Sequence, residues 1–208
     1  PQSVYAIETT VVFAGWNNPS GAAAMLSAGG RFYNDGSGSA GSYMGDIRAD
    51  VRIGGLGTTP TASWIVSRHT GTTDPNPTEP VAAGNFSITP EVGGTYRLYI
   101  RWNGTSFTFR FNGEEKTYTP PHGTRLDANR PFKQIYARIS NNSGKEAGIR
   151  GWFDDVRIND QAVLYDDFLQ AAIDPAKWPT YESARHIVDG RLRIKARTGP
   201  ASTAPLHN

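Results

Sequence analysis

Apolar and polar residues alternate with a period of two through most of this 208-residue chain. The pattern is clear in Gly45–Ile53 and Thr95–Trp102, where every second residue is apolar and those between are mostly charged or polar. Successive side chains of a β-strand point to opposite faces, so the alternation predicts half-buried strands rather than helices. The sequence contains 23 glycines and 14 prolines but only 2 methionines, which is typical of short strands joined by many turns.

Turn signals divide the chain into about twelve strands. Asn103-Gly104 and Asn112-Gly113 are hairpin signals within a three-stranded meander, and Thr70–Pro80 is predicted to be an irregular loop. A single helical turn is expected over Ala172–Trp178, with Asp174 as its N-cap. These features predict an all-β, two-sheet antiparallel sandwich with very little helix. The expected strands are Ser3–Phe13, Ala22–Tyr33, Gly45–Ile53, Ala62–His69, Thr95–Trp102, Ser106–Phe111, Glu115–Tyr118, Phe132–Asn141, Ile149–Asn159, Val163–Phe168 and Ile187–Arg197.

The composition of the chain argues against several classes of function. The formal net charge of +2 is too small to predict nucleic-acid binding, and the absence of cysteine excludes disulfides and thiolate metal sites. No run of 18 apolar residues occurs, so no membrane span is expected. The start at Pro1 is interpreted as a processed or truncated end, and we expect a secreted, extracellular or cell-surface protein.

Two segments carry a resemblance to a known family. The run Tyr96–Gly104 with the following Phe107–Phe111 strand, and the segment Gly151–Ile158 (GWFDDVRI), resemble concanavalin A-like (laminin-G-like) jelly-roll domains. The resemblance covers residues 1–160 and implies a jelly-roll sandwich. In this family a strand of the FDDVRI type lies near the C-terminal end of the domain.

The family's opening element occurs here after that strand instead of before the first one. It resembles Tyr165–Phe168 (YDDF), Trp178 and Asp189–Ile194 (DGRLRI). We therefore divide the chain into a jelly-roll body, residues 1–161, and an opening-strand segment, residues 162–208. The segment is expected to complete the sandwich of the next subunit, of the next repeat in a tandem array, or of its own body.

The position of the opening element after the terminal strand predicts the leading function. A segment that completes the sandwich of a neighbour builds a head-to-tail contact, and hence a filament or array of structural or cell-adhesion subunits by donor-strand complementation. The expected partners are identical subunits or neighbouring repeats. The side chains predicted to form the assembly strands are Tyr165, Phe168, Trp178, Ile187, Leu192 and Ile194.

The alternative is a monomeric, non-catalytic, lectin-like carbohydrate-binding module. Arginine and tyrosine side chains share the polar face of two predicted strands, and such planar groups suit glycan binding if the strands are neighbours. The possible glycan face comprises Arg97, Tyr99, Arg101, Tyr136 and Arg138.

Catalysis is not expected. Glucanases with the resembled fold use two carboxylates flanking the sugar bond, and on a strand these are two residues apart on one face. Here the acidic pairs Asp154-Asp155 and Asp166-Asp167 are adjacent in sequence, so their side chains point to opposite faces of a regular strand.

The resemblance also implies a structural calcium ion. Related sandwiches hold calcium with an aspartate of the FDDV strand and oxygens from the opening strands. Asp154, Asp155 and Asp167 match these positions, with Asp166 as an alternative to Asp167. No other cofactor is expected.

Overall fold

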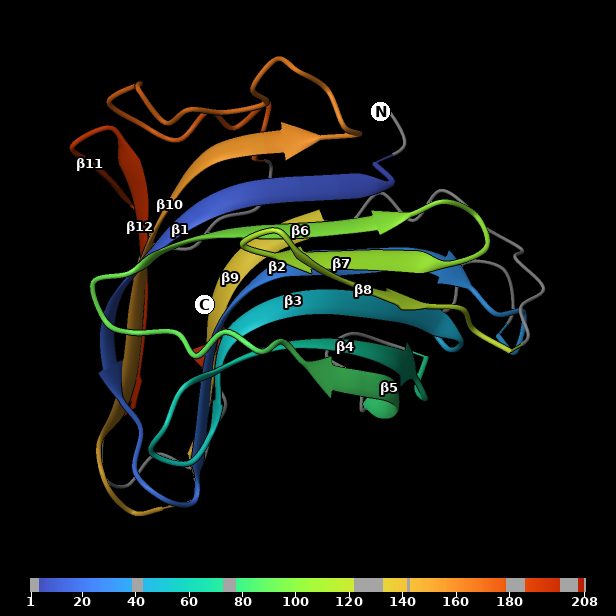
Figure 1. Cartoon of the computed structure of the whole chain (residues 1–208), viewed down its shortest axis with the longest axis horizontal. Helices are drawn as coiled ribbons and strands as arrows, with labels where there is room; N and C mark the ends of the chain where they lie inside the picture. The colour runs from blue at the N-terminus through green and yellow to red at the C-terminus, as the bar shows by residue number, and fades with distance from the viewer. Residues whose placement is uncertain are drawn as a thin grey trace.

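The computed structural model describes residues 4–38, 43–72, 78–121, 133–141, 143–178, 186–198 and 206–207. Its strands form two antiparallel sheets that pack face to face, which confirms the predicted all-β sandwich (Figure 1). Within the described residues there is no α-helix. The strands are β1 Ala6–Asn17, β2 Ala22–Asn34, β3 Asp46–Leu56, β4 Thr61–His69, β5 Thr78–Asn85, β6 Thr95–Trp102, β7 Phe107–Phe111, β8 Glu114–Tyr118, β9 Lys133–Asn141, β10 Ala147–Ile158, β11 His186–Val188, β12 Arg191–Thr198 and β13 Leu206–His207.

The order of strands shows how distant parts of the sequence meet. The seven-stranded sheet has the order β11-β12-β10-β1-β6-β7-β8, and the six-stranded sheet has the order β13-β9-β2-β3-β4-β5. The first long strand, β1, therefore lies between β10 and β6. Both sheets bend in the same sense, and the six-stranded sheet lies on the inner side of the bend (Figure 1). The face that it turns away from the other sheet is therefore concave, and we call it the concave face.

The hydrophobic core fills the space between the sheets. The alternating residues of β3, β6, β7 and β9 that the sequence marks as apolar all face inward, and most are completely buried. Aromatic rings join the two layers: Trp64 of β4 stacks on Phe109 of β7 at 4.8 Å between ring centroids, and Tyr33 of β2 stacks on Trp102 of β6 at 4.6 Å. These contacts fix how one sheet sits on the other.

The predicted turns are present between β6, β7 and β8. Asn103 side-chain Oδ1 accepts hydrogen bonds from the backbone N–H groups of Thr105 and Ser106, both at 2.8 Å. Asn112 and Gly113 both have positive φ, 50° and 90°, as a tight I′-type hairpin turn requires. Asp174 caps the predicted single turn, because its side chain accepts a hydrogen bond from Ala176 N–H at 2.8 Å.

Several strand predictions were wrong in detail. The end of the predicted loop Thr70–Pro80 belongs to β5, a largely exposed edge strand. The predicted strand Ile187–Arg197 is two strands, β11 and β12, joined by a turn at Asp189-Gly190 with positive φ at both residues. The predicted strand Val163–Phe168 reduces to one isolated bridge, between Asp166 and Val156 of β10.

A β-bulge in β10 changes which residues face the core. Asp155 has φ 51°, and the pairing with β1 skips a residue between Glu8 and Thr10. Phe153 and Val156 are consequently both buried although they are three residues apart. Trp152 is only partly buried on the outer side, with Arg193 over its ring at 5.7 Å.

The segment after β10 folds back along the same strand. Val156 N–H donates to Asp166 O at 2.9 Å, and Tyr165 N–H donates to Val156 O at 2.7 Å.

In the described residues no helix is long and apolar enough to cross a membrane.

Candidate functional site

The predicted glycan face is divided between the two sheets. Arg97, Tyr99 and Arg101 lie on β6 in the seven-stranded sheet, whereas Tyr136 and Arg138 lie on β9 in the six-stranded sheet. The condition for a single glycan face, that the two strands are neighbours, is not met, because β1 and β7 flank β6 while β2 and β13 flank β9. The two halves therefore form separate polar sites with different surroundings.

The β9 half belongs to a cluster on the concave face that we call the Tyr136 cluster: Ser27, Arg48, Asp50, Arg52, Tyr136 and Arg138. The Asp50 carboxylate lies at its centre and is completely buried. Arg48 donates to both carboxylate oxygens, at 3.0 and 3.2 Å, and Arg52 donates to one of them at 3.2 Å. The hydroxyl of Tyr136 donates to the Asp50 carboxylate at 3.1 Å, and the Arg48 guanidinium lies 4.9 Å from the centre of the Tyr136 ring.

The charges of this cluster determine the protonation state of Asp50. Burial by itself disfavours a charged carboxylate, but Arg48, Arg52 and the Tyr136 hydroxyl outweigh this effect and hold the pKa of Asp50 below its usual value. Burial likewise disfavours the charged guanidinium of Arg48, yet Asp50 raises its pKa overall. The cluster thus combines one ionised carboxylate with the positive charges of Arg48, Arg52 and Arg138.

Some polar atoms of the Tyr136 cluster are not used by the protein. Ser27 Oγ, Arg52 Nε and Arg138 Nε are buried and have no hydrogen-bond partner in the described part of the chain. Ser27 of β2 is paired in register with both Tyr136 and Arg52, which places these groups on one face. Native proteins leave few such groups unpaired, which marks this part of the concave face as a candidate binding surface.

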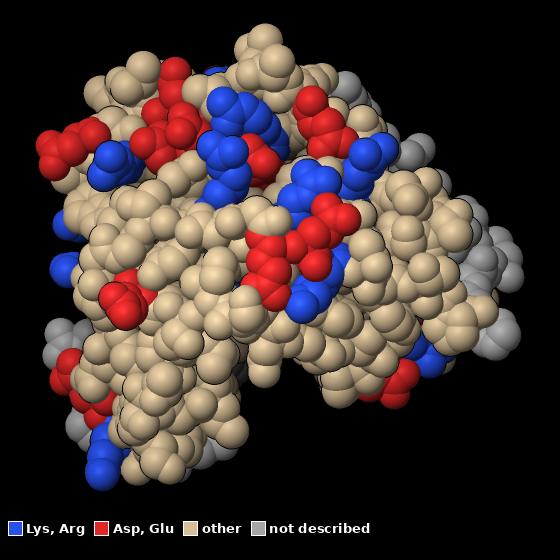
Figure 2. Space-filling view, in the orientation of Figure 1, with Lys and Arg blue, Asp and Glu red and all other residues tan. Residues whose placement is uncertain are grey.

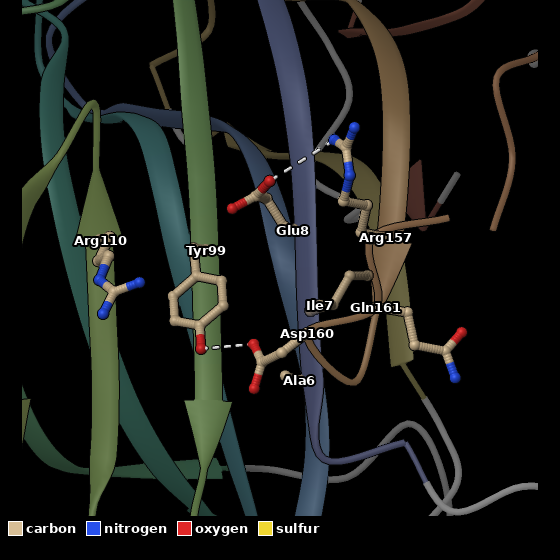
Figure 3. Close-up of a pocket in the computed structure, with 9 residues that line it drawn as sticks. Ala6, Ile7, Glu8, Tyr99, Arg110, Arg157, Asp160 and Gln161 are labelled. Atoms are coloured by element: carbon tan, nitrogen blue, oxygen red, sulfur yellow. Dashed lines mark hydrogen bonds and ion pairs between the residues drawn. The ribbon is translucent and has the colours of Figure 1, made fainter. Parts of the chain in front are cut away.

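Of the β6 half, Tyr99 lines a pocket on the outer face of the seven-stranded sheet, with a volume of about 240 Å³ (Figure 3). Its hydrogen-bonding groups are mostly paired with each other. Tyr99 donates to Asp160 at 2.7 Å, Arg157 lies 3.7 Å from Glu8, and the Arg110 guanidinium lies 4.8 Å from the centre of the Tyr99 ring. The lining residues are Ala6, Ile7, Glu8, Tyr99, Arg110, Arg157, Asp160, Gln161 and Ala162.

The surroundings of Tyr99 make it a hydrogen-bond donor over the whole physiological range. Burial, followed by the hydrogen bond to Asp160 and the negative charge of Asp160, raises the pKa of Tyr99 to about 12. Arg101 lies 3.4 Å from the same carboxylate.

Acidic and basic side chains alternate over the upper part of the face seen in Figure 2, and do not form a patch of one sign there.

The predicted calcium ligands lie around the β10 bulge. Asp154 Oδ2 is 3.4 Å from Arg191 Nε, and its Oδ1 accepts a hydrogen bond from Asp155 N–H at 2.9 Å. Asp167 accepts from Leu169 N–H, and Asp166 accepts from the Trp178 indole at 2.6 Å. In the ranges that the structure describes, no three His, Asp or Glu side chains are grouped as a metal site. Calcium binding at these aspartates stays a prediction from the resemblance.

The predicted assembly side chains pack on the body of their own chain. Phe168, Leu192 and Ile194 are buried in its core, and Tyr165, Trp178 and Ile187 pack against that core. Trp178 stacks on Phe168 with 5.7 Å between ring centroids, and β12 pairs with β10 from Phe153–Leu192 to Ala147–Thr198. In this structure the described residues of the C-terminal segment pack on their own body, as in the third of the three arrangements expected from the sequence, and completion of a neighbouring copy stays a prediction.

Sequence reasoning missed the centre of the Tyr136 cluster. Arg48, Asp50 and Arg52 were assigned only to the polar face of their strand. The alternation of charged and apolar residues in Gly45–Ile53 is also the ordinary pattern of a strand with one solvent-exposed face, so no signal in the sequence distinguished these three residues.

Comparisons with known proteins add little to this description. No family model matches the chain, and no curated protein matches it. Eight chains of solved structures match. One of them is the CBM2 module of the evolved Dit of Lactobacillus casei BL23 phage J-1, with 14% identity and a TM-score of 0.32 over 76% of this chain and 56% of that one. A TM-score of this size does not indicate a shared fold.

Proposed function

We propose that this protein is a non-catalytic, extracellular carbohydrate-binding module and that its ligand lies on the concave face. The observation that carries the proposal is the set of unpaired buried groups in the Tyr136 cluster: Ser27 Oγ, Arg52 Nε and Arg138 Nε. Leaving such a group unpaired costs about 1–3 kcal/mol, which a ligand recovers by supplying the missing partner. Sugar hydroxyls act as both donors and acceptors and suit this role.

The shape of the face also supports a glycan ligand. The six-stranded sheet lies inside the bend of the sandwich, so an extended chain of sugars can follow its curvature (Figure 1). The Arg48 and Arg52 side chains are partly exposed there, 22% and 19%, and their planar guanidinium groups are already oriented by Asp50. Donors fixed in advance lose little entropy on binding.

A glycan array followed by calorimetry on the positive sugars tests this function. Arg52→Ala and Arg138→Ala each remove one unpaired donor, and each is expected to weaken binding about tenfold. Arg110→Ala is the matched control, because this arginine lies in the other sheet, in an exposed ion pair with Glu115. Binding to no glycan, or the same loss in the control, would contradict the proposal.

A second candidate function is end-to-end assembly into a filament, as a structural or adhesive subunit. The specific observation in its favour is that one C-terminal segment supplies strands to both sheets, β11 and β12 to one and β13 to the other. The same contacts can be made with the body of a second copy. Deletion of residues 162–208 tests this candidate by size-exclusion chromatography, and a folded, stable, monomeric truncated protein would count against it.

A further inference from the structure

The turn that joins the body to the C-terminal segment has an unfavourable backbone. Gln161 N–H donates to Ile158 O at 3.1 Å, so Asn159 and Asp160 occupy the two central positions of the turn. Their φ angles are 54° and 58°, the left-handed values of a type I′ turn. Asparagine tolerates this conformation, but the second central position favours glycine, and the Cβ of Asp160 makes the turn costly.

Contacts with the body hold this turn closed. Asn159 Oδ1 accepts a hydrogen bond from Tyr5 N–H at 2.8 Å, and Asn159 N–H donates to Ala6 O at 3.0 Å. Asp160 accepts the hydroxyl hydrogen of Tyr99 at 2.7 Å (Figure 3). Asp160 also lies 3.4 Å from Arg101. The pocket described above therefore lies where β1 and β6 contact this turn.

The described residues after the turn contact the body through pairings that do not depend on which chain supplies them. Among these contacts are the bridge between Val156 and Asp166, the β10–β12 ladder and the burial of Phe168. A C-terminal segment from a second copy can make the same pairings with the same geometry. Only the turn Ile158–Gln161 must differ between the closed and the exchanged form.

We propose that the turn Ile158–Gln161 is the hinge for exchange of the C-terminal segment with a second copy of this chain, and that the Tyr99–Asp160 hydrogen bond is its latch. This inference rests on the assembly candidate above. Opening the turn removes the energetic cost of the left-handed backbone at Asn159 and Asp160, but it also breaks the latch. The balance between these two terms sets how much of the protein is exchanged.

Light scattering coupled to size-exclusion chromatography over a range of protein concentrations tests the hinge and the latch separately. Asp160→Pro cannot adopt the observed φ and drives the residue before it out of the turn, so it is expected to form exchanged dimers or longer assemblies. Tyr99→Phe removes only the latch, and its dimer dissociation constant is expected to fall about tenfold. Tyr96→Phe is the control, because that hydroxyl accepts from Glu91 N–H on the inner side of β6, away from the hinge.

The possible outcomes separate the two levels of the inference. A folded, monomeric Asp160→Pro protein at every concentration overturns both the hinge and the assembly candidate. Assembly of Asp160→Pro with identical behaviour of Tyr99→Phe and Tyr96→Phe overturns the latch alone. If Asp160→Pro does not fold, the comparison of Tyr99→Phe with Tyr96→Phe decides, and equal dissociation constants overturn the inference. Glycan binding is measured on the array and does not depend on these results.

Discussion

The hydroxyl of Tyr136 on β9 reaches over the intervening strand β2 and donates to the carboxylate of Asp50 on β3, at 3.1 Å. Two non-adjacent strands are linked in this way because β2 carries only small residues at this point, Ser27 and Gly29. The glycine matters most, since a Cβ at position 29 would contact Asp50 Cα at 2.8 Å and also meet Ala49 O and the Asp50 carboxylate.

Gly29→Ala is therefore expected to destabilise the protein by about 1–3 kcal/mol through overpacking. Urea unfolding followed by tryptophan fluorescence measures the change. Gly15→Ala is the control on the long strand β1 of the other sheet, where the closest atom to a new Cβ is Arg150 Cβ at 3.6 Å, an ordinary contact. Its cost is expected to stay below about 0.5 kcal/mol. Equal stabilities of the two variants would mean that β2 does not need a small residue beneath Asp50.

Asp50→Asn is expected to cost about 3–5 kcal/mol, because it leaves two arginines beside a neutral group in a buried site. The pKa of Asp50 is lowered in the folded state, so its contribution is present above the unfolded pKa, near 3.8, and is lost as pH falls through the lower folded value. The wild-type protein should thus lose stability below about pH 4, and Asp50→Asn should lose less over that range. Acid titration of the unfolding free energy shows the difference, and Glu115→Gln in an exposed pair should follow the wild type.

Lys133 gives a pH dependence of the same sign at neutral and alkaline pH. Burial lowers the pKa of its ammonium group to about 7, while the unfolded chain keeps a value near 10.5. Between these values the unfolded chain binds more protons, so the free energy of unfolding should rise with pH, by at most about 1.4 kcal/mol per pH unit. Lys133→Met is expected to abolish this rise. Lys116→Met, in an exposed pair with Glu114, should retain it, and a rise that persists in Lys133→Met would refute the assignment.

Ile194→Ala tests whether the C-terminal segment is part of the core. This side chain is completely buried, and its truncation should cost about 2–5 kcal/mol. Leu169→Ala, in the same segment but 76% exposed, should change stability by less than about 0.5 kcal/mol. Thermal unfolding of the two variants distinguishes a segment that belongs to the core from one that is only attached to it. If Ile194→Ala leaves the stability unchanged, β12 is not part of the core.

The strands with strict alternation could be predicted from the sequence almost to the residue. Thr95–Trp102 was predicted with its observed bounds, and the alternating apolar residues of β3 and β6 are the ones that face inward. Because side chains alternate between the two faces of a strand, the sequence pattern determines which residues face the core as soon as one face is buried. Where the backbone leaves the regular strand conformation, the prediction failed: Asp155 inserts a bulge, and Asp189 with Gly190 turns one predicted strand into two.

The candidate site was predicted only in pieces, because strand order is not encoded in local pattern. Tyr99 and Tyr136 share the same alternation, yet one lies in each sheet. The approach of Tyr136 to Asp50 depends on the pairing of β9 and β3 with the same strand, β2, and on small residues there. Long-range pairing of this kind becomes visible only with the three-dimensional structure.

The position of β12 beside β10 also has a consequence for biosynthesis. β10 ends at Ile158 and its partner β12 begins at Arg191, so a ribosome adding roughly 5–20 residues per second delivers the partner a few seconds after β10 has emerged. For that interval the outer edge of β10 carries free backbone N–H and C=O groups. Nascent chains on one message are close together at this moment, and the order of synthesis gives the segment of one chain a chance to pair with the body of the next.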